Sequence, residues 1–326
     1  CVTDLVQSIV MTGALAIVLI YGISRAGGWT AVMDNAAALP GYLSLTSTFD
    51  VASGSEVKYN FLTIFSTAAW GLGYFGMPHI LVRFMAIEDE KKLVLSRRIA
   101  SVWVVIAMTA GVLIGIVGLG MTKAGALETL TGSNSETIIV RIAGIISQHN
   151  ALTALIAGII LAGILAATMS TADSQMLAAA SGVSQNIVHD FLKIKISEKT
   201  NLLIARLTIV GIAIVSIFLA RNPDSSVFKI VSFAWAGFGG AFGAVVLCSL
   251  FWKRCNLAGA IAGIISGGAT VFIWKYLIRP LGGILDIYEL LPAFIVSLIF
   301  IIVVSLLTKA PDEEIVREFE AAGKKA

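Results

Sequence analysis

Long runs of apolar residues, separated by short polar stretches, dominate the chain. A helix needs about 20 apolar residues to cross the hydrocarbon core of a bilayer, and eight runs approach or exceed that length. Membrane β-strands would alternate apolar and polar residues, but the run FIVSLIFIIVVSLL at Phe294–Leu307 does not alternate. The pattern therefore predicts an all-α membrane protein. The predicted spans are Val6–Ile23, Phe61–Met85, Ala100–Gly120, Ala151–Ile187, Leu203–Ala220, Phe228–Phe251, Ala258–Leu277 and Leu291–Leu307.

The fourth run, Ala151–Ile187, is too long for a simple crossing. As one helix it would extend about 55 Å at 1.5 Å per residue, whereas the hydrocarbon core is about 30 Å thick. We therefore expect this helix to tilt or to project beyond the membrane.

Two longer stretches, Ser24–Asn60 and Met121–Asn150, lie between predicted spans. The second contains SETIIVRIAGIIS, which has apolar residues at helical spacing but is too short to span. We interpret it as an interfacial or re-entrant helix. The tail APDEEIVREFEAAGKKA is typical of a short amphipathic helix. The predicted organisation is a transmembrane domain over residues 1–308 and a tail over residues 309–326.

Composition agrees with a lipid environment. The chain of 326 residues is 57% apolar and 13% charged, with a mean hydropathy of +0.91. Soluble domains carry about a quarter charged residues, so an ordinary soluble globule and a disordered chain are excluded. The net charge of +3 does not indicate nucleic acid as a partner. The three cysteines of the chain have no spacing typical of a disulfide framework or a zinc site.

Lys and Arg residues predict the orientation. Cytoplasmic connections of membrane proteins are enriched in these residues. The bias is strongest if the C-terminus is cytoplasmic, because the connections after the second, fourth and sixth runs then lie inside. The first of these connections contains Lys91, Lys92, Arg97 and Arg98.

The second run contains several helix-breaking residues at mid-depth. Gly71, Gly73, Gly76 and Pro78 fall within eight residues. Each Gly costs about 1 kcal/mol in a helix interior and Pro about 3 kcal/mol. Unwound backbone within a membrane lines a cavity or is buried in protein, and discontinuous helices hold the substrate in many transporters. A simple kink remains the alternative interpretation, since Gly and Pro are common in membrane helices.

Two aromatic residues flank this break. Trp70 and Tyr74 lie four residues apart and share one helical face. They are candidates for the walls of a pocket for a small ring, although ordinary aromatic packing is an alternative. His79 follows Pro78 and is interpreted as a capping or packing residue.

The fourth run carries a ladder of small and hydroxyl residues. Ala167, Ser170, Thr171 and Ser174 lie at helical spacing on one face. A hard cation prefers oxygen ligands, and a carbonyl with two hydroxyls supplies three. Small and hydroxyl residues also serve close helix packing or donate back to a carbonyl four residues earlier. Both interpretations stay open for these residues alone.

A carboxylate within the same run favours a functional interpretation. Asp173 is the one charged residue between Ala151 and Gln185. An ionisable group at membrane depth indicates a functional site by default. Asp4, near the start of the first run, is a second candidate.

Glycine pairs four residues apart occur in three further runs. Such faces let helix backbones approach closely, so we assign them to packing. The pairs are Gly111 with Gly115, Gly239 with Gly243, and Gly259 with Gly263.

Five segments in order resemble the sodium/solute symporter family, and within it the proline carriers. They cover nearly the whole chain. The segments are AWGLGYFGMPHILVRFMA at Ala69–Ala86, ATMSTADSQ at Ala167–Gln175, SFAWAGFGGAFGAVVL at Ser232–Leu247, NLAGAIAGIISG at Asn256–Gly267 and YELLPAF at Tyr288–Phe294.

The resemblance implies an inverted-repeat, broken-helix fold of five plus five helices. The first span would be the last helix of the first repeat, the second to sixth spans would form the second repeat, and the last two would be peripheral. The chain would thus hold the C-terminal eight spans only. About five further helices would precede Cys1, which fits a start at a residue other than Met.

The resemblance also implies site residues. Sodium would be bound by the Ala167 carbonyl and the side chains of Ser170 and Thr171. The substrate pocket would be lined by Trp70, Tyr74 and Pro78. Some relatives bind a second sodium, and that site would use Asp4, Ser170, Asp173 and Ser174 here.

The function expected from this resemblance is sodium-coupled symport of a small amino acid, with proline as the passenger, across the cell inner membrane. Sodium would be the coupling ion, with no other cofactor. The alternatives are symport of another small organic solute, a transporter-like membrane sensor, or an ion channel. An enzyme is disfavoured because no nucleophile–base pair or metal cluster stands out.

Overall fold

The structure, a computed structural model, describes residues 2–194, 197–221 and 226–325. Helices account for most of these residues, and the strands among them form one two-stranded hairpin. Seven helices in the described ranges are long and apolar enough to cross a membrane. The predicted all-α membrane class is therefore confirmed. The second predicted span, Phe61–Met85, is not among the seven and consists of several short pieces.

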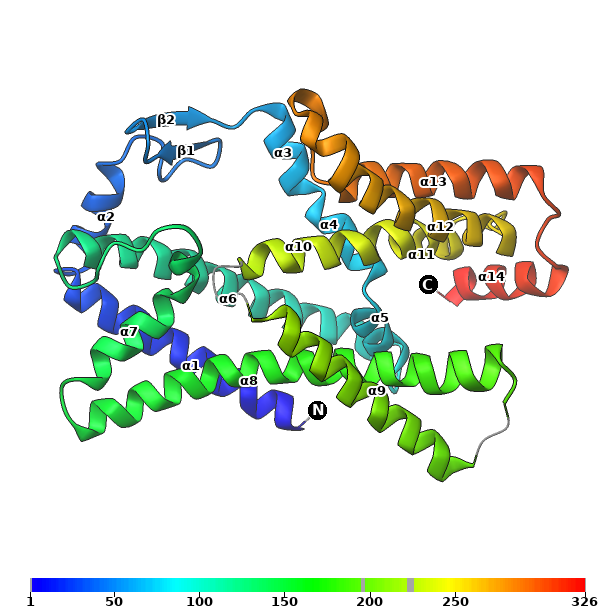
Figure 1. Cartoon of the computed structure of the whole chain (residues 1–326), viewed down its shortest axis with the longest axis horizontal. Coiled ribbons are helices and arrows are strands. Elements are labelled where there is room, and N and C mark those ends of the chain that lie inside the picture. The colour runs from blue at the N-terminus through cyan, green and yellow to red at the C-terminus, as the bar shows by residue number, and fades with distance from the viewer. Residues whose placement is uncertain (1, 195–196, 222–225, 326) are drawn as a thin grey trace. The chain divides into compact units, whose positions relative to one another are not determined.

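The chain forms two compact units (Figure 1). The first comprises residues 1–57 and 87–227. Its elements are α1 (Val2–Arg25), α2 (Trp29–Ala37), β1 (Ser47–Asp50), β2 (Ser55–Lys58, whose last residue belongs to the second unit), α6 (Lys92–Lys123), η2 (Gly132–Thr137), α7 (Ile138–Ser147), α8 (Ala151–Ser181), η3 (Gly182–Phe191) and α9 (Glu198–Leu219).

The core of the first unit lies where α1, α6, α7 and α8 meet. Val18 of α1, Val117 of α6, Ile142 of α7 and Ile160 of α8 are fully buried in one cluster. Small residues permit the crossing of α1 and α8, since a Cβ on Gly163 would lie only 3.0 Å from the Ala14 Cβ. The remaining faces of these helices are largely exposed and apolar, as expected for surfaces that contact lipid.

The helix α8 begins at a capping box. The Asn150 side chain accepts from the Thr153 backbone N–H, and the Thr153 hydroxyl accepts from the Asn150 backbone N–H. The helix continues into the π-helical segment η3, so that Ala151–Phe191 is one run of 41 residues. It is about 60 Å long at 1.5 Å per residue, which confirms the prediction of an overlong helix.

The second unit comprises residues 58–86 and 228–326. Its elements are α3 (Phe61–Ala68), α4 (Trp70–Gly73), η1 (Tyr74–Gly76), α5 (Pro78–Met85), α10 (Val227–Phe238, whose first residue belongs to the first unit), η4 (Gly239–Gly243), α11 (Ala244–Phe251), α12 (Leu257–Ile273), η5 (Trp274–Ile278), η6 (Arg279–Leu281), η7 (Gly283–Leu285), α13 (Leu290–Leu307) and α14 (Glu313–Lys325).

Glycines allow α12 and α13 to pack closely along each other (Figure 1). A Cβ on Gly259 would overlap the Ser305 side chain, and one on Gly263 would overlap Ile301. The predicted packing role of this pair is confirmed. A Cβ on Gly111 or Gly115 would meet nothing within 4 Å, so this pair packs against none of the described residues.

The polar stretches contain elements that the sequence pattern did not predict. Helix α2 and the hairpin of β1 and β2 both lie in Ser24–Asn60. The hairpin turn is held by the Asp50 carboxylate, which accepts from the backbone N–H groups of Ala52 and Ser53. The expected short helices after α6 and in the tail are confirmed as α7 and α14.

Contacts to the connection between α11 and α12 hold the start of the tail. The Asn256 side chain donates to the Lys309 carbonyl at 2.7 Å, and the Arg254 guanidinium donates to the Thr308 carbonyl at 2.8 Å. In α14, Glu320 lies 3.7 Å from the Lys253 ammonium. The connection between α11 and α12 thus contacts both the segment before α14 and the middle of α14.

Candidate functional site

The predicted break in the second run is present. Helices α3 and α4 and the single turn η1 lead to Met77, whose backbone is extended with φ −83° and ψ 110°, and α5 then starts with Pro78 as its first residue. Pro is favoured there because its missing N–H would have no partner in the first turn. An extended residue between two helices interrupts the helix, which is more than a bend in a continuous helix.

Glycines at the break permit a very close approach to the helix formed by α10, η4 and α11. A Cβ on Gly73 would overlap the Trp235 indole, and one on Gly76 would overlap the Phe238 backbone carbonyl. In the opposite direction, a Cβ on Gly239 would lie 2.6 Å from the Gly73 Cα. The glycines therefore serve this backbone-to-backbone contact as well as weakening the helix.

Trp70 lies within a group of aromatic rings. The rings of Phe228, Trp235 and Tyr288 are nearly parallel to it, at centroid distances of 5.5, 5.3 and 6.2 Å. Offset stacking of this kind contributes about 0.5–1.5 kcal/mol for a pair beyond its buried area. Trp70 thus has the packing role weighed as the alternative.

Tyr74 and Pro78 remain more accessible. The Tyr74 side chain is 51% exposed and meets the Trp235 ring edge-on at 4.8 Å. Pro78 is also exposed, whereas Met77 between them is buried. The three predicted substrate residues therefore lie on one interrupted segment. Within it, Trp70 is held by stacking on other rings, whereas the Tyr74 ring is exposed.

In the first unit, the hydroxyl ladder lies on α8 as predicted. The Ser170 hydroxyl donates to the Ala167 carbonyl at 3.3 Å, and the Ser174 hydroxyl donates to the Ser170 carbonyl at 3.0 Å. These are the local bonds of the packing alternative. These bonds use the hydroxyl hydrogens and leave lone pairs on the oxygens free to bind a cation. The Ser170 hydroxyl oxygen and the Ala167 carbonyl oxygen are close enough to contact one cation. Thr171 is exposed beside them.

The two candidate carboxylates lie on the same side of the crossing of α1 and α8. The helices run antiparallel and meet where Ala14 faces Gly163 (Figure 1). Asp4 precedes this point on α1, and Asp173 follows it on α8, each by about 15 Å of helix. Asp173 is exposed and Asp4 half-buried. The fold therefore brings the ends of the two helices that carry these residues to a common region of the unit.

The sodium:solute symporter family model matches residues 1–267. This chain belongs to that family. It is 38% identical to the osmoregulated proline transporter OpuE of Bacillus subtilis, over 97% of this chain and 61% of the relative. It is 36% identical to the sodium/proline symporter of Salmonella typhimurium, over 98% of this chain and 60% of the relative. The sodium/proline symporter of Escherichia coli is 37% identical, again over 98% and 60%.

The symporter-family chain thus spans about three-fifths of the length of these curated relatives. Its family and its apolar helices identify it as a multi-pass membrane protein. Among its described residues, no three His, Cys, Asp or Glu side chains are grouped to hold a metal ion.

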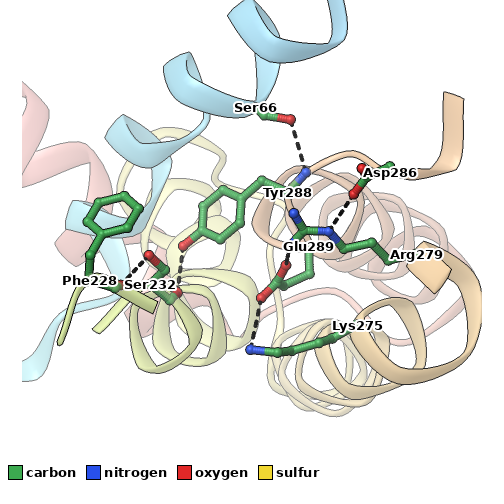
Figure 2. Close-up of polar contacts among 8 residues, drawn as sticks. All are labelled: Ser66, Phe228, Ser232, Lys275, Arg279, Asp286, Tyr288 and Glu289. Atoms are coloured by element: carbon green, nitrogen blue, oxygen red, sulfur yellow. Dashed lines mark hydrogen bonds and ion pairs between the residues drawn. The ribbon is translucent and has the colours of Figure 1, made fainter. Parts of the chain in front are cut away.

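Sequence reasoning missed one charged cluster of this symporter-family chain. Glu289 precedes α13 and is 1% exposed. Its carboxylate accepts from the Arg279 guanidinium at 2.9 Å and lies 3.6 Å from the Lys275 ammonium, and Arg279 also donates to Asp286 at 2.8 Å (Figure 2). The four-residue spacing of Lys275 and Arg279 was the available signal, but charges near the ends of spans are ordinarily interfacial.

Proposed function

We propose that this chain belongs to a sodium-coupled symporter that carries a small amino acid, with proline as its passenger, into the cell. The carrying observation is the interruption at Met77 and Pro78 within a segment of membrane-spanning length. Broken helices of this kind hold substrates near the bilayer midplane in secondary transporters.

The chemistry of the break suits a zwitterion with an apolar ring. The N-terminus of α5 carries the positive end of a helix dipole, which favours a carboxylate. Tyr74 offers an exposed ring and Pro78 an apolar surface on either side of Met77. In this proposal Trp70, Tyr74 and Pro78 line the substrate pocket, and Trp70 acts chiefly by holding the segment in place.

The proposed sodium ligands lie on α8. They are the Ala167 carbonyl and the hydroxyls of Ser170 and Thr171, an oxygen set that suits a hard cation. The arrangement of Asp4, Asp173 and Ser174 on antiparallel helices of one unit supports a second sodium site. Sodium bound at α8 raises the affinity for proline, and proline raises the affinity for sodium by the same factor.

The proposed topology follows the Lys and Arg bias. The membrane domain covers residues 1–308 in the cell inner membrane, and the tail of residues 309–326, with α14, is cytoplasmic. The chain supplies the C-terminal eight spans of a broken-helix fold with two inverted repeats of five helices. A membrane potential of 100 mV then contributes about 2.3 kcal/mol for each sodium ion that enters.

Uptake by the protein that contains this chain, reconstituted in proteoliposomes, tests the proposal. Labelled proline should accumulate in a sodium gradient and not in a choline gradient, and unlabelled proline should compete better than other amino acids. If another small solute competes better, the substrate is that solute. Uptake that is indifferent to sodium contradicts the proposal.

The sodium ligands have a matched control on the same helix. Ser170→Ala with Thr171→Ala should raise the sodium concentration for half-maximal uptake by roughly tenfold, since a tenfold change corresponds to about 1.4 kcal/mol. Thr168→Ala removes a hydroxyl that donates to the Ile164 carbonyl and should leave sodium dependence unchanged. Equal effects of the two changes would exclude a specific sodium site at Ser170 and Thr171.

A further inference from the structure

Tyr288 joins three elements of the second unit. Its hydroxyl donates to the Ser232 carbonyl of α10 at 2.6 Å, and its backbone N–H donates to the Ser66 hydroxyl of α3 at 3.0 Å (Figure 2). Its ring stacks on Trp70, and its side chain is buried. Tyr288, two residues before the start of α13, thus contacts both α10 and the first half of the broken helix.

The Glu289 carboxylate is directed toward Lys275 of η5 and Arg279 of η6 (Figure 2). Its side chain is 2% exposed between Lys275 and Arg279. The Lys275 ammonium also lies 3.8 Å from the centre of the Phe233 ring on α10. Because the carboxylate is buried, it depends on both cations, and a change of its position would leave charges without partners.

These contacts restrain two consecutive residues: Tyr288 by α3 and α10, and Glu289 by η5 and η6. Glu289 is fixed by cations from η5 and η6, so Tyr288 can reach α3 and α10 only in a narrow range of positions. Trp70 is in turn held by Tyr288 through ring stacking and by Trp235, whose indole donates to the Trp70 carbonyl at 3.0 Å. By contrast, α5 beyond the break contains no buried residue.

We propose that Tyr288 and Glu289 are positioning residues that hold the first half of the broken helix against α10, so that the Trp70–Tyr74 wall is preformed for substrate. The contacts of Tyr288 and Glu289 with Ser66, Ser232, Lys275 and Arg279 are called the Tyr288 clamp below. The link to substrate rests on the proposed function. The effect of the clamp on the mobility of α3 and α4 does not depend on that function.

The clamp predicts a change in substrate affinity rather than in turnover. Tyr288→Phe removes one hydrogen bond and keeps the ring, and Glu289→Gln keeps the shape and removes the charge. Each should raise the KM for proline by about three- to tenfold, because a loosened wall reduces the fraction of binding-competent protein. Vmax per folded protein and the KM for sodium should be unchanged in both variants. Protein abundance should be unchanged in Tyr288→Phe, whereas Glu289→Gln also lowers stability.

Two variants serve as matched controls. Tyr59→Phe removes a hydroxyl from an exposed tyrosine that precedes α3. Asp286→Asn removes the exposed partner of Arg279 and leaves the contact of Arg279 with Glu289 in place. Both should keep the KM for proline within about twofold, since exposed pairs contribute little.

A measurement without transport separates the clamp from the proposed function. A cysteine at Gly71 has open space for a nitroxide label, since a Cβ there meets nothing within 4 Å. Its difference spectrum, against the same protein without Gly71→Cys, reports the mobility of α4. Mobility should increase in Tyr288→Phe and Glu289→Gln, and not in Tyr59→Phe or Asp286→Asn.

The outcomes are distinct. Raised KM with raised mobility supports the clamp. Unchanged KM and unchanged mobility in both clamp variants overturn it, and so does a loss of abundance or Vmax without a shift in KM. If Glu289→Gln does not fold, Tyr288→Phe decides. If the unmodified protein takes up no proline, the proposed function fails, and label mobility alone decides whether the clamp exists.

Discussion

The indole N–H of Trp235 on α10 donates a hydrogen bond of 3.0 Å to the backbone carbonyl of Trp70 on α4. The two rings are also stacked, with centroids 5.3 Å apart. An indole has a donor and no acceptor, so a backbone carbonyl of the broken helix is a suitable partner for it. The bond joins residues 165 positions apart and fixes where the broken helix begins to pack on α10.

Trp235→Phe tests the contribution of this bond. The variant keeps a ring beside Trp70 and loses the donor, so it should lower the free energy of unfolding by about 1 kcal/mol. The measurement is thermal unfolding of the purified protein in detergent. Trp103→Phe is the control, because Trp103 lies on α6 in the first unit and is 38% exposed. An equal effect of both substitutions would mean that the Trp235 bond contributes nothing specific.

Gly76 should tolerate no side chain. A Cβ there would overlap the Phe238 backbone, and overpacking of this kind costs about 1–3 kcal/mol. Gly76→Ala should therefore lower both the thermal midpoint and proline uptake. The same change at Gly71, where a Cβ meets nothing within 4 Å, should be neutral or stabilising. A tolerated Gly76→Ala would show that the close approach to Phe238 is not required.

Asp173 gives a test of the second sodium site. Asp173→Asn removes the charge of one proposed ligand, and we expect the Hill coefficient for sodium to fall towards one, with roughly tenfold weaker sodium activation. Sodium-dependent uptake over a range of concentrations provides the measurement. The control is Asp190→Asn, an exposed carboxylate in η3 that contacts His189. A sodium curve unaffected by Asp173→Asn would argue that Asp173 binds no ion.

The cluster around Glu289 predicts non-additive effects on stability. Removing one partner of a buried ion pair costs about 3–5 kcal/mol, because charges remain buried without compensation. Glu289→Gln should therefore destabilise strongly. Adding Lys275→Met should recover part of the loss, because fewer cations then face the neutral side chain. Unfolding midpoints of the four proteins in this cycle give the coupling, and simple additivity would contradict the pairing.

The thiol of Cys255 should show a shifted pH dependence. This residue lies in the connection between α11 and α12, where burial raises the pKa of its thiol above the ordinary value. Since the thiolate is the reactive form, alkylation of Cys255 should be slow at neutral pH and keep accelerating above pH of about 8.5, the ordinary thiol pKa. A cysteine introduced as Ala321→Cys in the exposed part of α14 should reach its plateau earlier. Identical profiles would contradict the shift.

Several features of the fold could be predicted because their causes are local. Apolar runs of spanning length determine helices in lipid, since each backbone polar group must be satisfied within the segment. The break at Met77 follows from Gly73, Gly76 and Pro78, which are close together in the sequence. The overlong α8 follows from a long apolar run that contains no proline.

Other features depend on polar signals that are weak in isolation. The hairpin of β1 and β2 was not predicted, although Asp50, Ser53 and Gly54 are typical turn residues. The close packing at Gly259 and Gly263 was predicted from spacing, but the same spacing at Gly111 and Gly115 meets no partner among the described residues. Spacing indicates a face that can pack and does not say which helix covers it.

By itself, the sequence determined the all-α membrane class, the position of the break and the oxygen-rich face of α8. Each follows from residues within a few turns of one another. Only the tertiary structure decided that Trp70 is stacked among rings from α10 and from the segment before α13, and that Glu289 is buried between Lys275 and Arg279. Such contacts join residues far apart in the chain, and burial of a charge depends on the partners that the fold brings to it.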